Sequence, residues 1–491
     1  MFVSPRGIEI GSPLGGPARL VIPDDPNPGA DPWSNTGPLL PAGWAPDGRS
    51  IAFVRTDTLY VQDLAGGVPR PLAQGGEMHS FAWSPDGRWI ACVRGNRQSR
   101  QPGFMFANLG PATIWLIPAA GGEGLAVTDD QWFNASPTWA PGSRSLLFAS
   151  NRAGGVDLFQ IRLRQNGAPE GAPVRLTNGL RAQAISLAAS GRWIAYSDFA
   201  ETSNIWSLPI PPDPPASVRE AEPVTTGSQI TEGFDLSPDG RWIAFDSDRS
   251  GNQDIYRRPL AGGEVERLTE GAADEFWPQW SPSGAEIAFH AFKGGRRHLF
   301  LMSADGRDRR QITDGQEDER SAAWSADGQS LYYLHNFSGT GSELRALTRA
   351  PNGGWSQPRT VFRGVAYPPV ASPDGRLMAF TSTGAVWVVG GAGNSARILV
   401  PRSSRAADPR ALYVDWSEDS RTLYYLAVDP AEQASIWSVA LTGGPPRLMV
   451  RFDDPTREWH RFGFKASAGR FYFTVGDRQS DLWAAEVEAS R

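Results

Sequence analysis

The chain has 491 residues, of which 54 are Gly, 41 Pro and 19 Trp, and 40% are hydrophobic. These amounts of turn-forming and aromatic residues favour many short strands joined by tight turns over a helical protein. The formal net charge of −6 argues against a nucleic-acid-binding protein, which would carry a basic stripe. The single cysteine, Cys92, excludes an internal disulfide framework. The sequence contains no run of about 18 apolar residues, so it predicts no membrane-spanning helix. No signal peptide is visible in the chain as given.

A short motif, typified by Trp-Ser-Pro-Asp-Gly followed by an apolar strand, recurs ten times at a spacing of roughly 45 residues. The copies begin at Trp44, Trp83, Trp139, Leu187, Leu236, Trp280, Trp324, Ala371, Trp416 and Phe464. Asp-Gly between two apolar runs predicts a tight hairpin, because Gly takes the positive φ that the turn needs. We therefore interpret the motif as an architectural turn and not as a site.

Each copy has the composition of one small sheet. The residue nine positions after the start of the motif is aromatic in nine copies and Cys92 in the other. A third strand such as "QDIYRRP" follows in most copies, and then a Gly-rich or polar turn and a short fourth strand. Four antiparallel strands per repeat predict the blades of a β-propeller, which must stack because one sheet cannot cover both its faces. The predicted fold class is all-β, with ten blades.

The two ends of the chain suggest how the ring closes. The tenth repeat has three strands and no fourth, and the N-terminal "GGPARLVIPDD" matches the fourth-strand segment "GGPPRLMVRF". We therefore expect residues 1–25 to supply the closing strand of the last blade, which would remove an exposed edge. This makes residues 1–491 a single domain with one ring of ten blades. Two smaller propellers in tandem are the alternative, and they need a second closure point inside the chain.

The repeats resemble those of a known family. "SPDGRWIAFDSDRSGNQDIY" and "GGEVERLTEG" resemble the WD-repeat-like "Pro-Asp" propellers of the TolB family. "GNRQSRQPGFMFANLGPATIWLIPAAGG" and "SRSLLFASNRAGGVDLFQIRL" are similar to the C-terminal propellers of bacterial serine/threonine protein kinases. The resemblance implies an extracytoplasmic sensor or scaffold domain, or a TolB-like periplasmic protein-binding propeller. The kinase motifs are missing from this sequence, so kinase activity would belong to a domain outside it.

Motifs for catalysis or metal binding are also missing. There is no Gly-x-Ser-x-Gly elbow and no His-Glu-x-x-His helix, and we expect no metal and no cofactor. The loop from Asp246 to Asp254 has the alternating oxygen ligands that suit Ca²⁺, but Arg257 stands where an EF-hand has its glutamate. We interpret it as a structural loop whose shape depends on Arg249 and Asp254. Cys92 takes an aromatic position, which indicates a buried core thiol.

The segments that lead into the first strand of each repeat differ from copy to copy, and in a propeller they open on the channel mouth. We predict a rim there that binds a ligand or partner. Its residues are His79, Asn134, Gln183, Glu232, Glu275, Phe276, Arg320, Tyr367, Tyr413, Trp459 and His460. The inserted loop from Gly95 to Pro111 should project on the same face and plug the channel or contact a partner. Its apolar residues are Phe104, Met105 and Phe106.

The predicted function is a non-catalytic propeller that binds a protein, a peptide or a small ligand at its channel mouth, as a monomer and without nucleic acid. An enzyme such as a lyase or glycosidase, with an active site in the channel, is the alternative. Glu232 and Glu275 could then act as an acid–base pair. A buried carboxylate or histidine cluster with shifted pKa values would favour the enzyme.

Overall fold

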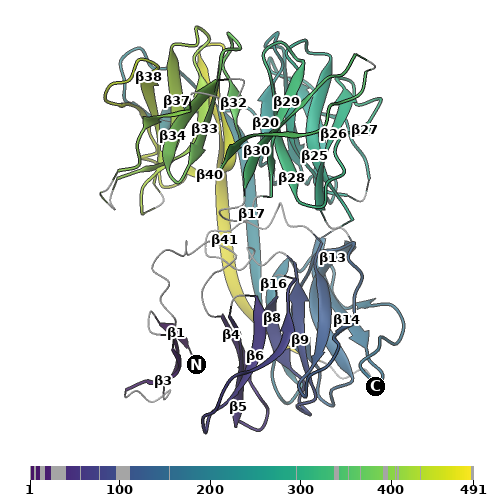
Figure 1. Ribbon diagram of the computed structural model, residues 1–491. Helices are drawn as coiled ribbons and strands as arrows, with labels where there is room; N and C mark the ends of the chain where they lie inside the picture. Colours follow the sequence, from purple (N-terminus) through teal and green to yellow (C-terminus); the bar gives the residue numbers. More distant parts are fainter. Residues whose placement is uncertain are drawn as a thin grey trace. The chain divides into compact units, whose positions relative to one another are not determined.

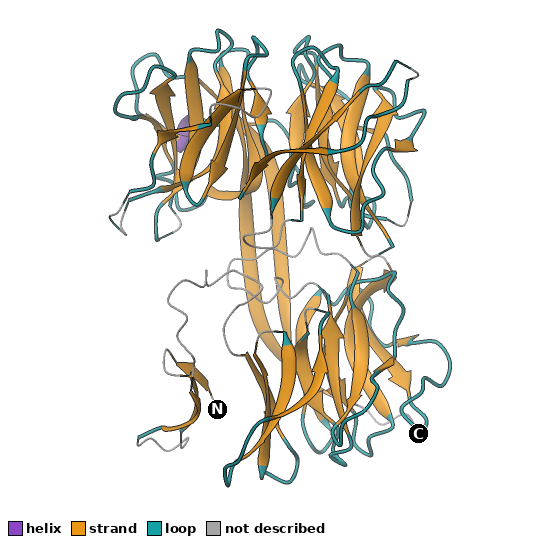
Figure 2. Ribbon diagram, viewed as in Figure 1, coloured by secondary structure: helices purple, strands orange, loops and turns teal. Residues whose placement is uncertain are grey.

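A computed structural model describes most of the chain, and nearly all its regular structure is β-strand (Figure 2). Outside the description lie residues 1, 5–6, 12–16, 24–39, 56, 77, 96–110, 154, 272, 295, 337–341, 352, 365–366, 391–395, 404, 406–407, 432 and 488–491, and the side chains of 2–4, 40–42, 183, 199–200, 458–462, 478 and 480. One 3-10 turn, η2 (Val218–Glu220), occurs among the strands. Within the described part, no helix is long and apolar enough to cross a membrane.

The chain divides into two compact units. Unit 1 is Met1–Ala200 with Gln479–Arg491, and unit 2 is Glu201–Arg478. The division into two units departs from the expected single domain. Both boundaries fall inside strands, because β17 (Trp193–Pro209) and β41 (Arg470–Glu486) are each 17 residues long. These two strands are neighbours in one sheet (Figure 1).

Unit 2 contains five sheets of four consecutive antiparallel strands, as the repeat predicts. The strands are β20 (Phe234–Leu236), β21 (Trp242–Ser247), β22 (Asp254–Pro259) and β23 (Glu266–Arg267); β24 (Glu275–Trp280), β25 (Glu286–Lys293), β26 (Arg296–Ser303) and β27 (Arg310–Gln311); β28 (Glu319–Trp324), β29 (Ser330–His335), β30 (Glu343–Thr348) and β31 (Arg359–Arg363); β32 (Val370–Ala371), β33 (Leu377–Ser382), β34 (Ala385–Gly390) and β35 (Arg397–Val400); and β36 (Arg410–Trp416), β37 (Thr422–Val428), β38 (Ala434–Ala440) and β39 (Arg447–Arg451). A short strand β18 (Ala216–Ser217) adds in parallel to β39.

A sixth sheet closes unit 2 into a ring. It consists of β40 (Glu458–Ser467), the first part of β41, the second part of β17, and β19 (Glu222–Pro223). The first strands β20, β24, β28, β32, β36 and β40 contact one another in this order, and β40 also contacts β20. This closing sheet thus combines β17 and β19 from the middle of the chain with β40 and β41 from near its C-terminal end.

The expectation that residues 1–25 complete the last blade is wrong. Those residues form their own sheet of β1 (Phe2–Ser4), β2 (Gly7–Ile10) and β3 (Arg19–Pro23). The physical reason lies in β17. Between Tyr196 and Asn204 the sequence has no Gly or Pro that could make a hairpin, so the strand runs on and supplies the strand that β41 needs.

Unit 1 also contains three sheets of four consecutive strands. These are β4 (Leu40–Trp44), β5 (Ser50–Arg55), β6 (Thr58–Asp63) and β7 (Arg70–Gln74); β8 (His79–Trp83), β9 (Trp89–Arg94), β10 (Thr113–Pro118) and β11 (Leu125–Ala126); and β12 (Asn134–Trp139), β13 (Ser145–Ala153), β14 (Gly155–Arg162) and β15 (Val174–Arg175). In a further sheet, β16 (Ala182–Leu187) pairs with the first part of β17, and β17 pairs with β41. The first strands β4, β8, β12 and β16 contact one another in this order.

The motif turns are architectural, as predicted. In the copy at Leu236, the Ser237 hydroxyl donates to Asp239 Oδ1 at 2.6 Å and accepts from the Trp242 N–H at 2.9 Å. Gly240 has a φ of 67°. Cys92 is fully buried, and burial raises the pKa of its thiol to about 12, so the prediction of a core thiol is confirmed.

The loop after Asp246 is fixed by the two residues that we singled out. The Arg249 guanidinium lies over the rings of Phe245 and Tyr256, at 5.3 and 5.0 Å from their centroids. Asp254 accepts hydrogen bonds from Ser250 at 2.7 Å and from Arg267 at 2.6 Å. These side-chain contacts fix the shape of the loop, as we predicted from the sequence.

Candidate functional site

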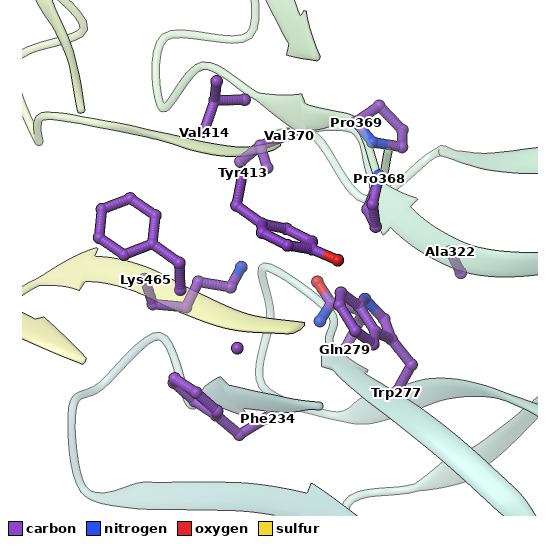
Figure 3. Close-up of a pocket in the computed structure, with 12 residues that line it drawn as sticks. Phe234, Trp277, Gln279, Ala322, Pro368, Pro369, Val370, Tyr413, Val414 and Lys465 are labelled. Carbon is purple, nitrogen blue, oxygen red and sulfur yellow. The ribbon is translucent and has the colours of Figure 1, made fainter. Parts of the chain in front are cut away.

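The first strands of unit 2 surround a central pocket to which all six sheets contribute (Figure 3). It encloses about 380 Å³ of space that no atom fills, open solvent included. One lining residue from each sheet in turn is Phe234, Gln279, Ala322, Val370, Tyr413 and Phe464. The pocket is therefore the axial channel of the ring, and it is mainly apolar and aromatic.

Two of these first strands, β24 and β28, carry a bulge that turns one side chain out of the regular alternation. The register with the second strand shifts between Phe276 and Gln279, and between Arg320 and Ala323. The residue in the middle has a positive φ, 61° at Trp277 and 54° at Ser321. Two bulges in unit 1 place Ser80 and Ser136 in the same conformation, with φ of 52° and 51°. A bulky residue in this region is a genuine outlier, and the strain costs about 1–3 kcal/mol.

Trp277 is the bulge residue that lines the pocket, and a hydrogen bond to Asp246 holds its backbone conformation. The Asp246 carboxylate accepts hydrogen bonds from the Trp277 N–H at 3.0 Å, the Gly233 N–H at 2.9 Å and the Glu232 N–H at 2.6 Å. Burial, and then the nearby Glu232, raises the pKa of Asp246 well above its usual value. The indole packs against the ring of Tyr413, another lining residue, with ring centroids 6.2 Å apart (Figure 3).

A cation also faces the pocket. Lys465 Nζ lies 3.0 Å from Asp235 Oδ1, and the two side chains are 18% and 11% exposed. Burial opposes the charge on Lys465, but Asp235 and Asp415 outweigh it and raise the pKa of the ammonium. Both carboxylates are anchored, Asp235 by the Trp280 N–H and Asp415 by the Ala466 N–H, each at 2.8 Å. Burial raises the pKa of Asp415.

The structure brings together four of the predicted rim residues in unit 2. Tyr413 lines the pocket, and Tyr367 meets it edge-on with ring centroids 5.2 Å apart. Burial and Arg297 lower the pKa of Arg320 to about 9, while Tyr413 and Glu232 act in the opposite direction. Arg320 thus lies within electrostatic reach of both Tyr413 and Glu232.

Glu275 and Phe276, which we also predicted for the rim, do not line the pocket. Both are fully buried. Glu275 forms an ion pair with Arg309, and burial raises the pKa of its carboxyl to about 7. Phe276 stacks on His290 with centroids 5.8 Å apart. The bulge explains this placement, because it turns Trp277 toward the channel and leaves the preceding side chain in the core.

His79 and Asn134 belong to unit 1, where both are buried. His79 Nε2 lies 2.7 Å from the Gly95 carbonyl, and Asn134 donates to the Ala112 carbonyl at 2.6 Å. These bonds hold the ends of neighbouring loops. The side chains of Gln183, Trp459 and His460, and the loop with Phe104, Met105 and Phe106, lie outside the described residues.

Sequence reasoning missed Trp277 and Lys465, although both interrupt the repeat. The residue after the motif start is Ser or Ala in nine copies and Lys465 in the tenth. The bulge residue is Ser at positions 80, 136 and 321 and Trp at position 277. An alignment of the ten copies, position by position, would have revealed both residues as departures from the repeat. Within the described part of the chain, no group of three or more His, Cys, Asp or Glu residues is placed to hold a metal ion.

No protein-family model matches the sequence. A curated relative, the uncharacterized protein Atu1656 of Agrobacterium fabrum, is 44% identical over 55 residues, which are 11% of this chain and 19% of that protein. The chain thus matches about a fifth of the length of this relative.

Three solved structures illustrate the structural similarity. A TolB-like protein of Agrobacterium tumefaciens has a TM-score of 0.45 at 19% identity, over 57% of this chain and 99% of that one. TolB of Acinetobacter baumannii has a TM-score of 0.24 at 19% identity, over 66% of both chains. An oligogalacturonate lyase of Vibrio parahaemolyticus has a TM-score of 0.36 at 14% identity, over 62% of this chain and 89% of that one. These values carry no inference about activity; the arrangement of its own four-stranded sheets identifies the chain as a β-propeller protein.

Proposed function

We propose that unit 2 is a non-catalytic binding module that holds a protein segment, a peptide or a small molecule at the central pocket. The observation that carries this proposal is Trp277, which keeps a strained φ of 61° and faces Tyr413 in the channel. The same positive φ recurs at Ser80, Ser136 and Ser321, so the bulge itself belongs to the architecture. Trp277 differs because a bulky aromatic side chain stands where these bulges have Ser, and such strain persists only where the surroundings impose it. Here the three hydrogen bonds to Asp246 impose it.

The composition of the pocket supports the same proposal. Apolar walls with a few oriented polar groups are the usual composition of a ligand site. The faces of Trp277 and Tyr413 can stack on a flat or apolar group. The Lys465 ammonium has three donors, of which Asp235 Oδ1 accepts one, so it can also donate to an oxygen of the ligand.

The test is a thermal-shift screen of the full chain against a defined set of synthetic peptides and small molecules. A ligand of the pocket should stabilise the wild type and bind at least tenfold more weakly to Trp277→Ser, which places the residue of the sister bulges at this position. Trp193→Ser, at an exposed tryptophan of unit 1, is the control. Ligands whose affinity is the same for Trp277→Ser and the wild type would contradict the pocket as the site.

The proposal includes an extracytoplasmic, sensor- or scaffold-like role, which rests on the resemblance of the repeats to the TolB and kinase-associated propellers. The location is tested by fusing the natural gene product to two reporter enzymes. One reporter is active only in the cytoplasm, and the other is active only after export. Activity of the cytoplasmic reporter alone would contradict this part of the proposal and leave the binding site untouched.

A channel enzyme is the second candidate, and raised carboxyl pKa values favour it. Burial raises the pKa of Asp274 and of Glu275 to about 7, which suits a general acid near neutral pH. Neither residue lines the pocket, and Arg309 holds Glu275, so we prefer the non-catalytic function. Mass spectrometry of each pocket ligand after incubation decides between them. Bond cleavage that Glu275→Gln abolishes would establish the enzyme.

A further inference from the structure

The last part of β41 exposes a position that is buried in every comparable strand. Asp481–Glu486 has the pattern of a third strand, with Leu482 before a central aromatic residue. In the nine other third strands the residue at the place of Leu482 is 0–4% exposed, including Leu59, Ile114 and Leu158 of unit 1. Leu482 is 87% exposed, and Trp483 beside it is 52% exposed. A surface that this repeat always covers is thus open here.

One edge of the same segment has no partner strand in the described part of the chain. On its other edge β41 pairs with β17, where the Val487 N–H donates to the Arg192 carbonyl at 2.7 Å. Its pairing with β40 reaches only to Gly476. In the three sister sheets of unit 1, the fourth strands β7, β11 and β15 pair with this edge. An unpaired strand edge is a template for the addition of another strand.

Asp481 indicates the charge of the missing strand. The equivalent carboxylates in two complete sheets are Asp157 and Asp254, and each pairs with an arginine of its fourth strand. Arg175 lies 2.5 Å from Asp157, and Arg267 lies 2.6 Å from Asp254. Asp481 has the same place in its repeat, on an exposed strand. An arginine on the added strand would complete the same pair.

The rest of the fourth strand indicates the other side chains. In β7 and β39 the fourth strand carries apolar residues, Leu72 in one and Met449 and Val450 in the other. Leu72 joins Leu59 in one buried cluster, and Val450 joins Ile436 in another. The fourth strand therefore covers the residue that corresponds to Leu482. Burying such a leucine removes apolar surface from water and so stabilises a complex.

Charge disfavours a second copy of the same edge as the occupant. Two antiparallel copies of Asp481–Glu486 would bring Asp481 of one close to Glu486 of the other, and like charges across a strand pair destabilise it. In this chain Glu486 pairs with Arg192 at 2.6 Å, which again shows that the strand suits a basic neighbour.

We propose that Asp481–Glu486 of β41 is a strand-addition site for an extended segment of a partner protein. The segment carries an arginine that pairs with Asp481, and apolar residues after it that cover Leu482. This site belongs to unit 1 and is independent of the pocket in unit 2. Its affinity comes from main-chain hydrogen bonds, and its specificity comes from the arginine and the apolar positions.

The probe is a fluorescent peptide with the sequence of residues 171–180, "GAPVRLTNGL", in which Arg175 is the arginine that pairs with Asp157, and its binding to the full chain is measured by anisotropy. Because the Val487 N–H points to β17, alternation directs the Ala484 N–H to the open edge. Ala484→Pro removes that donor without removing a bond to β17, and a proline is tolerated on an open edge. We expect Ala484→Pro to weaken peptide binding at least tenfold while the thermal unfolding curve stays unchanged.

A charge swap tests the arginine. Asp481→Arg should weaken binding of the peptide at least tenfold, and a peptide with Glu in place of Arg175 should bind Asp481→Arg better than it binds the wild type. Glu123→Arg, on an exposed turn of unit 1, is the charge control and should bind like the wild type. No binding of the peptide, or binding that neither variant weakens, would overturn the proposal. Dimers in sedimentation that Ala484→Pro dissociates would also overturn it, because a second copy would then occupy the edge.

Discussion

The Lys465 ammonium lies 3.0 Å from Asp235 Oδ1, and this pair joins the two strands at which the ring of unit 2 closes. Lys465 comes from β40, and Asp235 comes from β20, the first strand of the neighbouring sheet. Asp415 on β36, the other neighbour of β40, adds its charge from the opposite side. One cation thus links three consecutive sheets at the closure.

Replacing Lys465 with Met should therefore destabilise unit 2 more than the loss of one contact would. The variant leaves Asp235 and Asp415 without their cation, and removing one partner of such a buried pair costs about 3 kcal/mol. The double variant Lys465→Met with Asp235→Asn should recover part of this loss, because it also removes an uncompensated charge. Urea unfolding of both variants and the wild type measures the difference. A Lys465→Met variant as stable as the wild type would contradict a role in closure.

The unfolding free energy should depend on pH through Asp274 and Glu275. In the folded chain these carboxyls keep their protons up to about pH 7, whereas in the unfolded chain they lose them near pH 4. The folded state binds more protons in between, so this contribution to stability is full below about pH 4 and fades as the pH rises to about 7. Unfolding of the wild type and of Asp274→Asn and Glu275→Gln, at steps of pH between 4 and 7.5, measures it. Both variants should show a flatter slope, and slopes equal to that of the wild type would refute the burial of these protons.

The local structure could be predicted from the sequence, and the closure could not. A turn such as the one at Gly240 depends on a few neighbouring residues, and its Ser, Asp and Gly are all visible in the repeat. Which strand completes the last sheet depends on pairing between residues far apart in the chain, as between Ile210 and Gly469. "GGPARLVIPDD" has the sequence of a fourth strand, yet β3 pairs with β2.

The candidate site was predictable to a similar extent. Variation between repeats led to Tyr367 and Tyr413, which do meet near the channel. It also led to Phe276, which lies in the core. The positive φ at Trp277 reverses this assignment, and a backbone conformation of that kind is set by Asp246 on another strand rather than by local sequence.

Two leucines at equivalent places should respond differently to the same change. Leu158 and Leu482 both precede the central aromatic residue of a third strand in unit 1, but they are 4% and 87% exposed. Leu158→Ala leaves a cavity between two sheets and should cost about 2–5 kcal/mol, whereas Leu482→Ala should change the stability by less than about 0.5 kcal/mol. Guanidinium unfolding of the two variants compares them. Equal losses would mean that Leu482 is covered in the isolated protein, and hence that its strand edge is already occupied.

The strain at Trp277 should be measurable by comparison with a neighbouring tryptophan. Trp280→Gly removes a side chain that is 7% exposed from regular strand, and should cost about 3–5 kcal/mol or more. Trp277→Gly removes a ring of the same size, but Gly adopts a φ of 61° without penalty, so about 1–3 kcal/mol of strain is released and offsets part of the loss. Trp277→Ala separates the two contributions, because Ala loses the ring and keeps most of the strain. The expected order of unfolding free energies is therefore Trp277→Gly above Trp277→Ala, and Trp277→Gly above Trp280→Gly. An alanine variant more stable than the glycine variant would show that the bulge at Trp277 relaxes once the ring is gone, and that Asp246 alone does not impose it.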